Sequence, residues 1–176
     1  SENIFEAGIR LLNLSLDYDP ARFDAIPRKG PLLVVANHPF GVADGLAISA
    51  LLTRVRPDVK IMCHSLLCQP QEAQRFLLPV DFGNSRAARK CSANTRRQSV
   101  EWLEKGHCLV LFLGGGVATR QRPSSGPALE LPWHGFVGKL AAVDNTSVLP
   151  VYFHGENSKL FHMASQWSYA LRLALL

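Results

Sequence analysis

A chain of 176 residues that is 47% hydrophobic and 19% charged is long enough to bury the core of one domain. Its apolar stretches fall short of the roughly 18 to 20 residues that cross a membrane, and it lacks the layout of a signal peptide, so we expect a soluble or peripheral protein. The net charge of +5 indicates an anionic partner: a phosphate-bearing substrate, an acidic carrier protein, nucleic acid or an anionic membrane surface.

In the first half of the chain, helical and strand patterns alternate. Residues 3–14 have the apolar spacing of an amphipathic helix, and the continuous apolar run at 31–36 is typical of a strand covered on both faces. The segment 45–55 predicts a helix and 59–64 a second strand. Residues 65–77 are expected to be partly helical or irregular before the third strand.

The second half continues this alternation. The pattern predicts strands at 77–81, 108–113 and 147–155 and helices at 92–105 and 136–145. Ser92 and Asn94 are the candidate caps of the first of these helices, and Gly106 is its stop. The Gly-, Ser- and Pro-rich residues 114–133 predict a long surface loop that shapes a site.

These elements predict the fold class. Strands that alternate with helices indicate a single α/β domain over 1–176, with a largely parallel central sheet flanked by helices. The chain starts abruptly in a helical pattern and stops in the apolar run YALRLALL, so we expect truncation of a longer protein at one or both ends.

The first chemical motif follows the strand at 31–36. In VVANHPFGVADG, His38 lies where the strand ends, which is where open α/β sheets bind ligands, and Asp44 follows six residues later. A carboxylate can fix the tautomer of an imidazole that accepts a proton, and the turn at Pro39 and Gly41 can bring the two together. The alternative is a packed His38 and an Asp44 that only caps the next helix, and the spacing favours neither.

Four blocks resemble the PlsC-like superfamily of lysophospholipid and glycerol-phosphate acyltransferases. NHPFGVADG is similar to its first block and is closest in wording to the haemolysin-like branch, which includes lyso-ornithine-lipid acyltransferases. LPVDFGNSRAARK, LVLFLGGGVATR and VLPVYFHGENS resemble the second, third and fourth blocks. The four matches occur in the family's order and extend over about residues 31–158.

Two departures from the family pattern stand out. The common first block has four residues between its histidine and its acid, whereas five separate His38 from Asp44. The third block usually reads Phe-Pro-Glu-Gly, but here Phe112 is followed by Leu113 and Gly114, so the glutamate associated with the acceptor is absent. This absence favours an acceptor other than glycerol phosphate.

The resemblance implies a reaction and its participants. His38 would remove a proton from the hydroxyl of a lyso-lipid as that oxygen attacks an acyl thioester, and Asp44 would orient the imidazole. The thioester, on acyl carrier protein or coenzyme A, is a co-substrate, and no cofactor, metal or nucleic acid is expected. The enzyme would take part in phospholipid or related lipid biosynthesis as a peripheral protein at the cytoplasmic face of the membrane. A hydrolase with the same pair and a non-catalytic lipid-binding domain are the alternatives.

Further candidates surround this pair. The resemblance implies that Arg86 contacts an anionic part of a substrate, with Arg89 and Lys90 as helpers, whereas Arg96 and Arg97 are expected on a solvated helix face. Asn37 is a further candidate for binding substrate. The glycines 114–116 would let backbone N–H groups approach a substrate or would only form a tight turn. The substrate-binding set is Asn37, Arg86, Arg89, Gly114, Gly115 and Gly116.

The remaining cysteines and histidines are predicted to be structural. Cys63, Cys68, Cys91 and Cys108 include no CxxC pair, which favours reduced thiols over disulfides or a zinc site. Four further histidines have no acid at a suggestive spacing, and the one in the long loop is the least certain: His107, His134, His154 and His162. The aromatic residues lie in apolar contexts and not between basic ones, so nucleic-acid binding is not expected.

Overall fold

A parallel five-stranded sheet forms the centre of the computed structural model, which describes residues 3–69, 71–120 and 126–167. The strands lie in the order β3-β2-β4-β1-β5, and each neighbouring pair is parallel. Their bounds are Leu32–Ala36 (β1), Val59–His64 (β2), Leu77–Val80 (β3), Cys108–Phe112 (β4) and Ser147–Val151 (β5). The predicted α/β class with a largely parallel sheet is confirmed.

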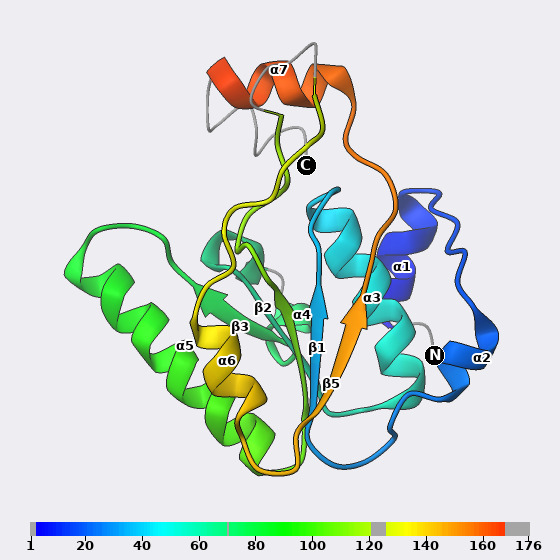
Figure 1. Ribbon diagram of the computed structural model, residues 1–176, viewed down its shortest axis with the longest axis vertical. Helices are drawn as coiled ribbons and strands as arrows, with labels where there is room; N and C mark the ends of the chain where they lie inside the picture. The colour runs from blue at the N-terminus through cyan, green and yellow to red at the C-terminus, as the bar shows by residue number, and fades with distance from the viewer. Residues whose placement is uncertain (1–2, 70, 121–125, 168–176) are drawn as a thin grey trace.

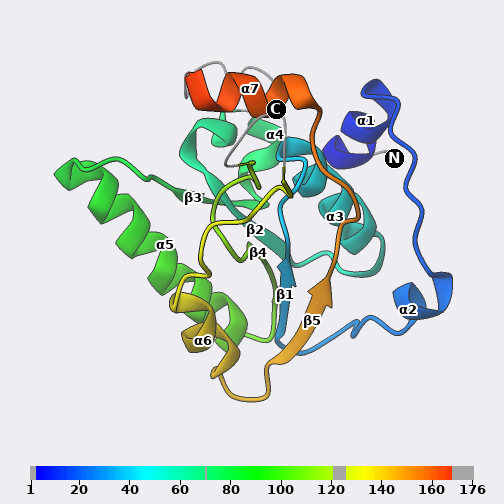
Figure 2. The ribbon, with the colours of Figure 1, turned by 45° about the horizontal axis from the view of Figure 1, so that its top comes forward.

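Helices cover both faces of the sheet (Figure 1). Helices α5 and α6 lie on one face, α1 and α3 lie on the other, and α7 lies beyond the carboxyl ends of the strands (Figures 1 and 2). Within the described residues, no helix is long and apolar enough to cross a membrane. The helices are Ile4–Leu11 (α1), Pro20–Asp24 (α2), Val42–Val55 (α3), the 3₁₀ turn Ser65–Cys68 (η1), Gln71–Gln74 (α4), Arg86–Glu104 (α5), Phe136–Ala141 (α6) and Lys159–Trp167 (α7).

Burial on both faces explains the continuous apolar runs of the central strands β1 and β4. Successive side chains of a strand point to opposite faces, so alternate residues of β1 enter different cores. Leu32 and Val34 join the core under α3, whereas Leu33 packs with residues of α5 and α6. A strand that is buried on both faces is apolar along its whole length. The first polar side chains of this segment therefore follow β1 at the carboxyl edge of the sheet.

Several predicted helix bounds were wrong for identifiable reasons. Helix α5 begins at Arg86 and not near residue 92, because the Ser85 side chain caps it by accepting a hydrogen bond from the N–H of Ala88 at 3.0 Å. Its first turns carry basic residues and small alanines, so they lack the apolar spacing that marks a helix. Helix α3 likewise starts at Val42, which places Asp44 in its first turn.

A buried arginine network closes the opposite, amino-terminal end of the sheet. Arg56 is 1% exposed and donates to both carboxylate oxygens of Asp58, at 2.9 and 2.6 Å. It also donates to the carbonyl oxygens of Pro27, Gly30 and Gly106, so the segments that lead into β1 and β4 are tied to one guanidinium. Burial alone would raise the pKa of the Asp58 carboxyl, but the hydrogen bonds and charge of Arg56 outweigh it and hold that pKa below its ordinary value.

The Arg56→Met variant should lose about 3–5 kcal/mol of unfolding free energy, since it leaves the Asp58 carboxylate and three carbonyls without their donor. Urea denaturation measures this loss. Because the folded pKa of Asp58 is depressed, the pair's contribution is complete above the carboxyl's ordinary pKa and disappears as the pH falls through the depressed value. The control is Arg54→Met, which removes an exposed ion pair with Glu6 and should cost under about 1 kcal/mol. Equal losses in the two variants would contradict this assignment.

Candidate active site

His38 and Asp44 form a hydrogen-bonded pair at the carboxyl edge of the sheet. The Nδ1 atom of His38 lies 3.0 Å from Oδ2 of Asp44, whose side chain is only 1% exposed, whereas that of His38 is 16% exposed. An ionised carboxylate can only accept, so Nδ1 carries the proton and Nε2 keeps its lone pair. Among the described residues, no group forms a hydrogen bond with Nε2, which leaves it able to accept a proton.

The turn between His38 and Asp44 explains why their side chains are in contact although five residues separate them. Oδ2 of Asp44 also accepts hydrogen bonds from the N–H groups of Phe40, at 2.8 Å, and Gly41, at 3.0 Å. Gly41 has a φ of 72°, a conformation that glycine adopts without strain, and it immediately precedes α3. Asp44 therefore both caps α3, where the helix dipole favours a carboxylate, and holds His38. The structure thus shows Asp44 at the start of the helix and within hydrogen-bond distance of His38, and a catalytic role of the pair stays a prediction.

Three other contacts fix the His38 ring and backbone. The imidazole stacks on Phe112 at the end of β4, with ring centroids 3.8 Å apart. The carbonyl of His38 accepts from the N–H of Ala118 at 2.9 Å. Asn37 exchanges two hydrogen bonds with the backbone of Phe153, at 2.8 and 2.6 Å, and so ties the histidine turn to the segment after β5. The role of Asn37 in substrate binding stays a prediction, because its amide is engaged by Phe153.

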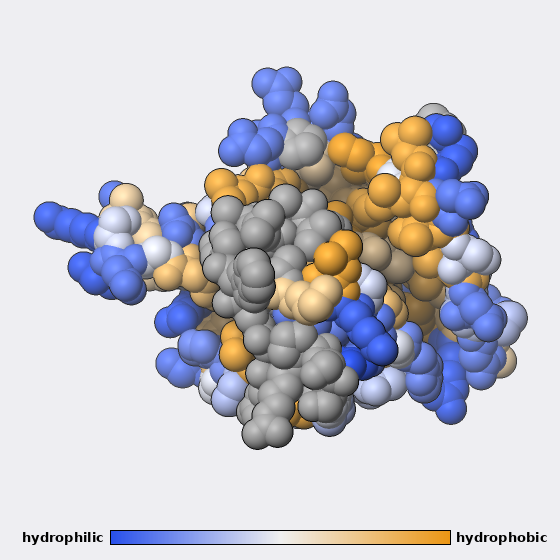
Figure 3. Space-filling model, turned by 90° about the horizontal axis from the view of Figure 1, so that it is seen from above, coloured by the Kyte–Doolittle hydropathy of each residue, from blue (hydrophilic) through white to orange (hydrophobic). Residues whose placement is uncertain are grey.

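The pair faces a cavity of about 970 Å³ with largely apolar walls. It lies among α1, α3, the carboxyl ends of β2, β3 and β4, and the loop after β4. Hydrophobic side chains gather on this face of the molecule (Figure 3). Four of those that line the cavity are also between 45% and 58% exposed, so its mouth is hydrophobic as well: Leu66, Leu67, Phe82 and Leu131.

The three glycines after β4 also line this cavity. The N–H of Gly115 closes a turn on the carbonyl of Phe112 at 3.1 Å, and Gly115 has a φ of 65°. A Cβ on Gly114 would lie 2.9 Å from the carbonyl oxygen of Leu131, so only glycine permits this close approach of the loop. The structure thus shows a tight turn at the cavity, and an interaction of these glycines with substrate stays a prediction.

Glu130 is a site residue that the sequence analysis missed. It comes from the loop before α6, where an antiparallel bridge between Thr119 and Leu129 folds the chain back toward β4. The Glu130 carboxylate accepts a hydrogen bond from the backbone N–H of His38 at 2.5 Å. The third block lacks its usual glutamate, yet a carboxylate from elsewhere in the chain reaches the turn at His38. The one sequence signal that could have identified Glu130 is its position between two leucines, Leu129 and Leu131, in a loop rich in small residues.

The basic residues of α5 are distributed differently from the prediction. Arg86 and Arg89 lie in the first turn of α5, are exposed, and are not among the residues that line the cavity. Arg89 donates to the carbonyl of Asn84 at 2.8 Å. Arg96 is exposed, as we expected, but it also lines the cavity, and Arg97 pairs with Glu101 on the surface.

The remaining histidines and cysteines are placed as follows. His107 lies 3.2 Å from Oδ2 of Asp58 and His162 lies 3.6 Å from Glu156, so each has an acid that sequence spacing did not reveal. Burial lowers the pKa of His162, which is fully buried. The four cysteines are free, and burial raises the pKa of the Cys108 thiol to about 12. No group of three or more potential metal ligands occurs among the described residues.

Comparison with known proteins shows which family the chain resembles. The model of a protein family described as "Acyltransferase" matches residues 5–175, nearly the whole chain. The chain is also similar to a lyso-glycine lipid O-acyltransferase from Phocaeicola vulgatus, with 22% identity over 167 residues, 89% of this chain and 56% of that protein. The chain thus spans about half the length of the curated relative that it matches.

Proposed function

The chain belongs to this acyltransferase family, and from that premise we propose that it transfers a fatty acyl group from a thioester to a hydroxyl of a lyso-lipid. The observation that carries the proposal is the His38–Asp44 pair, whose free Nε2 borders an apolar cavity. A cavity of about 970 Å³ is large enough for a lipid chain as well as the reacting groups. The name of the relative from P. vulgatus supports a lyso-lipid acceptor.

The geometry supports a direct transfer. Nε2 of His38 takes the proton of the acceptor hydroxyl as that oxygen attacks the thioester carbonyl, and Asp44 stabilises the imidazolium that forms. The tetrahedral intermediate then collapses, the bond to sulfur breaks, and the imidazolium returns its proton to the thiolate. The N–H groups of Gly114 and Gly116, which do not close the turn, are our candidates for stabilising the developing oxyanion. No covalent intermediate with the protein is needed.

The mouth of the cavity supports action at a membrane surface. Leu66, Leu67, Phe82 and Leu131 expose apolar area beside the site, and the net charge of +5 suits anionic headgroups or an acidic carrier protein. We propose a peripheral enzyme at the cytoplasmic face, where carrier protein and coenzyme A thioesters are available. The haemolysin-like branch of the superfamily fits the wording of the first block and belongs to the same proposal.

The test is to incubate the full-length protein with a labelled acyl-carrier-protein or coenzyme A thioester, with and without lyso-lipid, and to identify the labelled products. We expect labelled diacylated lipid only when the acceptor is present. Free fatty acid in equal amounts with and without acceptor would establish a hydrolase instead. Lipid binding without turnover of either donor would establish a non-catalytic lipid-binding domain.

A further inference from the structure

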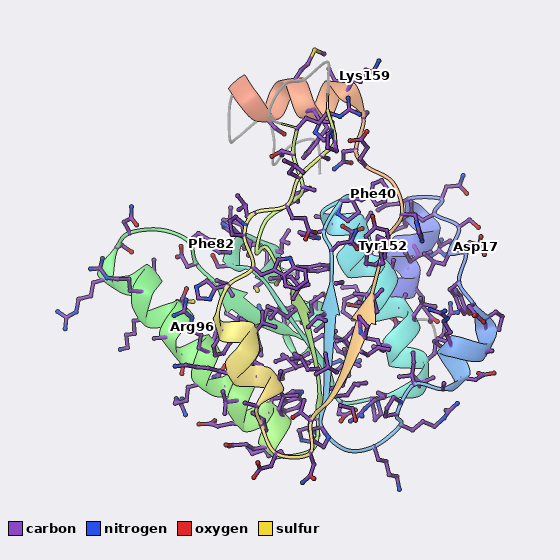
Figure 4. All side chains as sticks on the ribbon, in the orientation of Figure 1. Asp17, Phe40, Phe82, Arg96, Tyr152 and Lys159 are labelled. Carbon is purple, nitrogen blue, oxygen red and sulfur yellow. The ribbon has the colours of Figure 1, made fainter. Side chains whose placement is uncertain are left out.

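Arg96 is the only lysine, arginine, aspartate or glutamate among the described residues that line the cavity. It projects from the middle of α5, near the start of α6 (Figure 4). The cavity extends from this arginine to His38, so one charged group and the proposed base border the same apolar space. Arg96 is exposed, so its guanidinium lies at the rim of the cavity and can meet a ligand that enters from solvent.

The contacts of Arg96 include no acid. Within the described ranges, no carboxylate lies at ion-pair distance from its guanidinium, which lies over the ring of Phe136, 5.7 Å from the ring centroid. Nη2 of Arg96 lies 3.3 Å from Nε2 of His134. The next residue on the helix differs: Arg97 donates to Glu101 at 2.6 Å and to Asn94 at 2.9 Å. The two neighbouring arginines thus have opposite electrostatic surroundings.

The hydrogen bonds of His134 place an N–H group of its ring opposite the N–H groups of Arg96. Its Nδ1 accepts from the backbone N–H of Phe136 at 3.2 Å, so Nδ1 carries no proton. The proton of the imidazole therefore sits on Nε2, which faces Arg96. A guanidinium can only donate, so the two groups present N–H bonds to each other with no acceptor between them. An oxygen atom of a ligand could accept hydrogen bonds from the N–H groups of both Arg96 and His134.

We propose that Arg96 and His134 bind a phosphate or carboxylate group of a substrate at the rim of the cavity. The inference rests on the proposed function, because it places this anion on a molecule whose reacting group lies at His38. Charge-assisted hydrogen bonds to a guanidinium suit either anion. The anion comes from the phosphates of a thioester donor or from the headgroup of the acceptor lipid. Recognition at this subsite holds one end of a substrate while the apolar walls hold its chain.

Direct binding tests the subsite without any turnover. In the full-length protein labelled with ¹⁵N-histidine, millimolar inorganic phosphate should shift the Nε2 resonance of His134. The shift should be lost in Arg96→Gln and kept in Arg97→Gln, the matched control on the same helix. A His134 resonance that phosphate leaves unchanged, or that responds equally in the two variants, overturns the proposal. This readout decides the subsite even if the protein transfers no acyl group.

Kinetics identify the source of the anion. For the substrate that carries it, Arg96→Gln should raise KM by about 10- to 100-fold and Arg97→Gln should not. Each variant is assayed with acyl-coenzyme A and with an acyl thioester of N-acetylcysteamine, which lacks phosphates. A defect confined to acyl-coenzyme A assigns the anion to the donor, whereas a defect with both donors, in the KM of the lyso-lipid, assigns it to the acceptor headgroup. Identical kinetics of the two variants with every substrate contradict the proposal.

Discussion

The His38→Ala variant should keep its fold and lose about 10²- to 10⁴-fold in kcat for acyl transfer. The loss follows from the position of His38, which lines the cavity and whose Nδ1 is held by Asp44, so that Nε2 is the nitrogen that can accept the proton of the acceptor hydroxyl. The KM values should change much less, since the imidazole acts on the reacting atoms and not on the apolar chain. Steady-state rates with a labelled thioester and lyso-lipid measure this.

Two further variants keep this prediction testable. His38→Gln preserves more of the packing on Phe112 if the alanine variant proves unstable. His154→Ala removes an exposed histidine outside the cavity and should retain normal turnover. Near-normal acyl transfer by a well-folded His38→Ala protein would remove His38 from the mechanism.

The Asp44→Asn variant should also lose most activity, by about 10²-fold or more, although its geometry can be retained. An amide oxygen in the place of Oδ2 can accept the same three hydrogen bonds, from Nδ1 of His38 and the N–H groups of Phe40 and Gly41. The variant lacks the negative charge that stabilises the imidazolium, so kcat falls. Its NH₂ group would replace Oδ1, which is buried without a partner among the described residues, and this costs about 1–3 kcal/mol of stability.

The double variant separates a shared role from independent ones. Because Asp44 acts through His38, combining Asp44→Asn with His38→Ala should reduce kcat little further than His38→Ala alone. Multiplying losses would instead indicate that Asp44 contributes by another route. Chemical denaturation of all three proteins corrects for any difference in stability.

The fold class was predictable because a strand that is buried on both faces of a sheet is a continuous apolar run in the sequence. The central strands β1 and β4 are short apolar runs, and the alternation of strands with helical segments indicated the parallel sheet. Helix starts were less predictable where a hydroxyl cap and basic first turn replaced apolar spacing, as at Ser85. Helices α2 and α7 were not anticipated, and the five residues of α2 are too few to establish a period of 3.6.

The sequence by itself determined that a histidine and an acid follow the first strand, since both lie in one short turn whose glycine permits it. Only the tertiary structure decided that Glu130 reaches His38 and that Arg96, not Arg86 or Arg89, lines the cavity. Glu130 lies 92 residues from its partner, and Arg96 approaches His134 from 38 residues away. Such contacts depend on how loops and helices pack across the sheet, and the spacing of residues along the sequence does not indicate that packing.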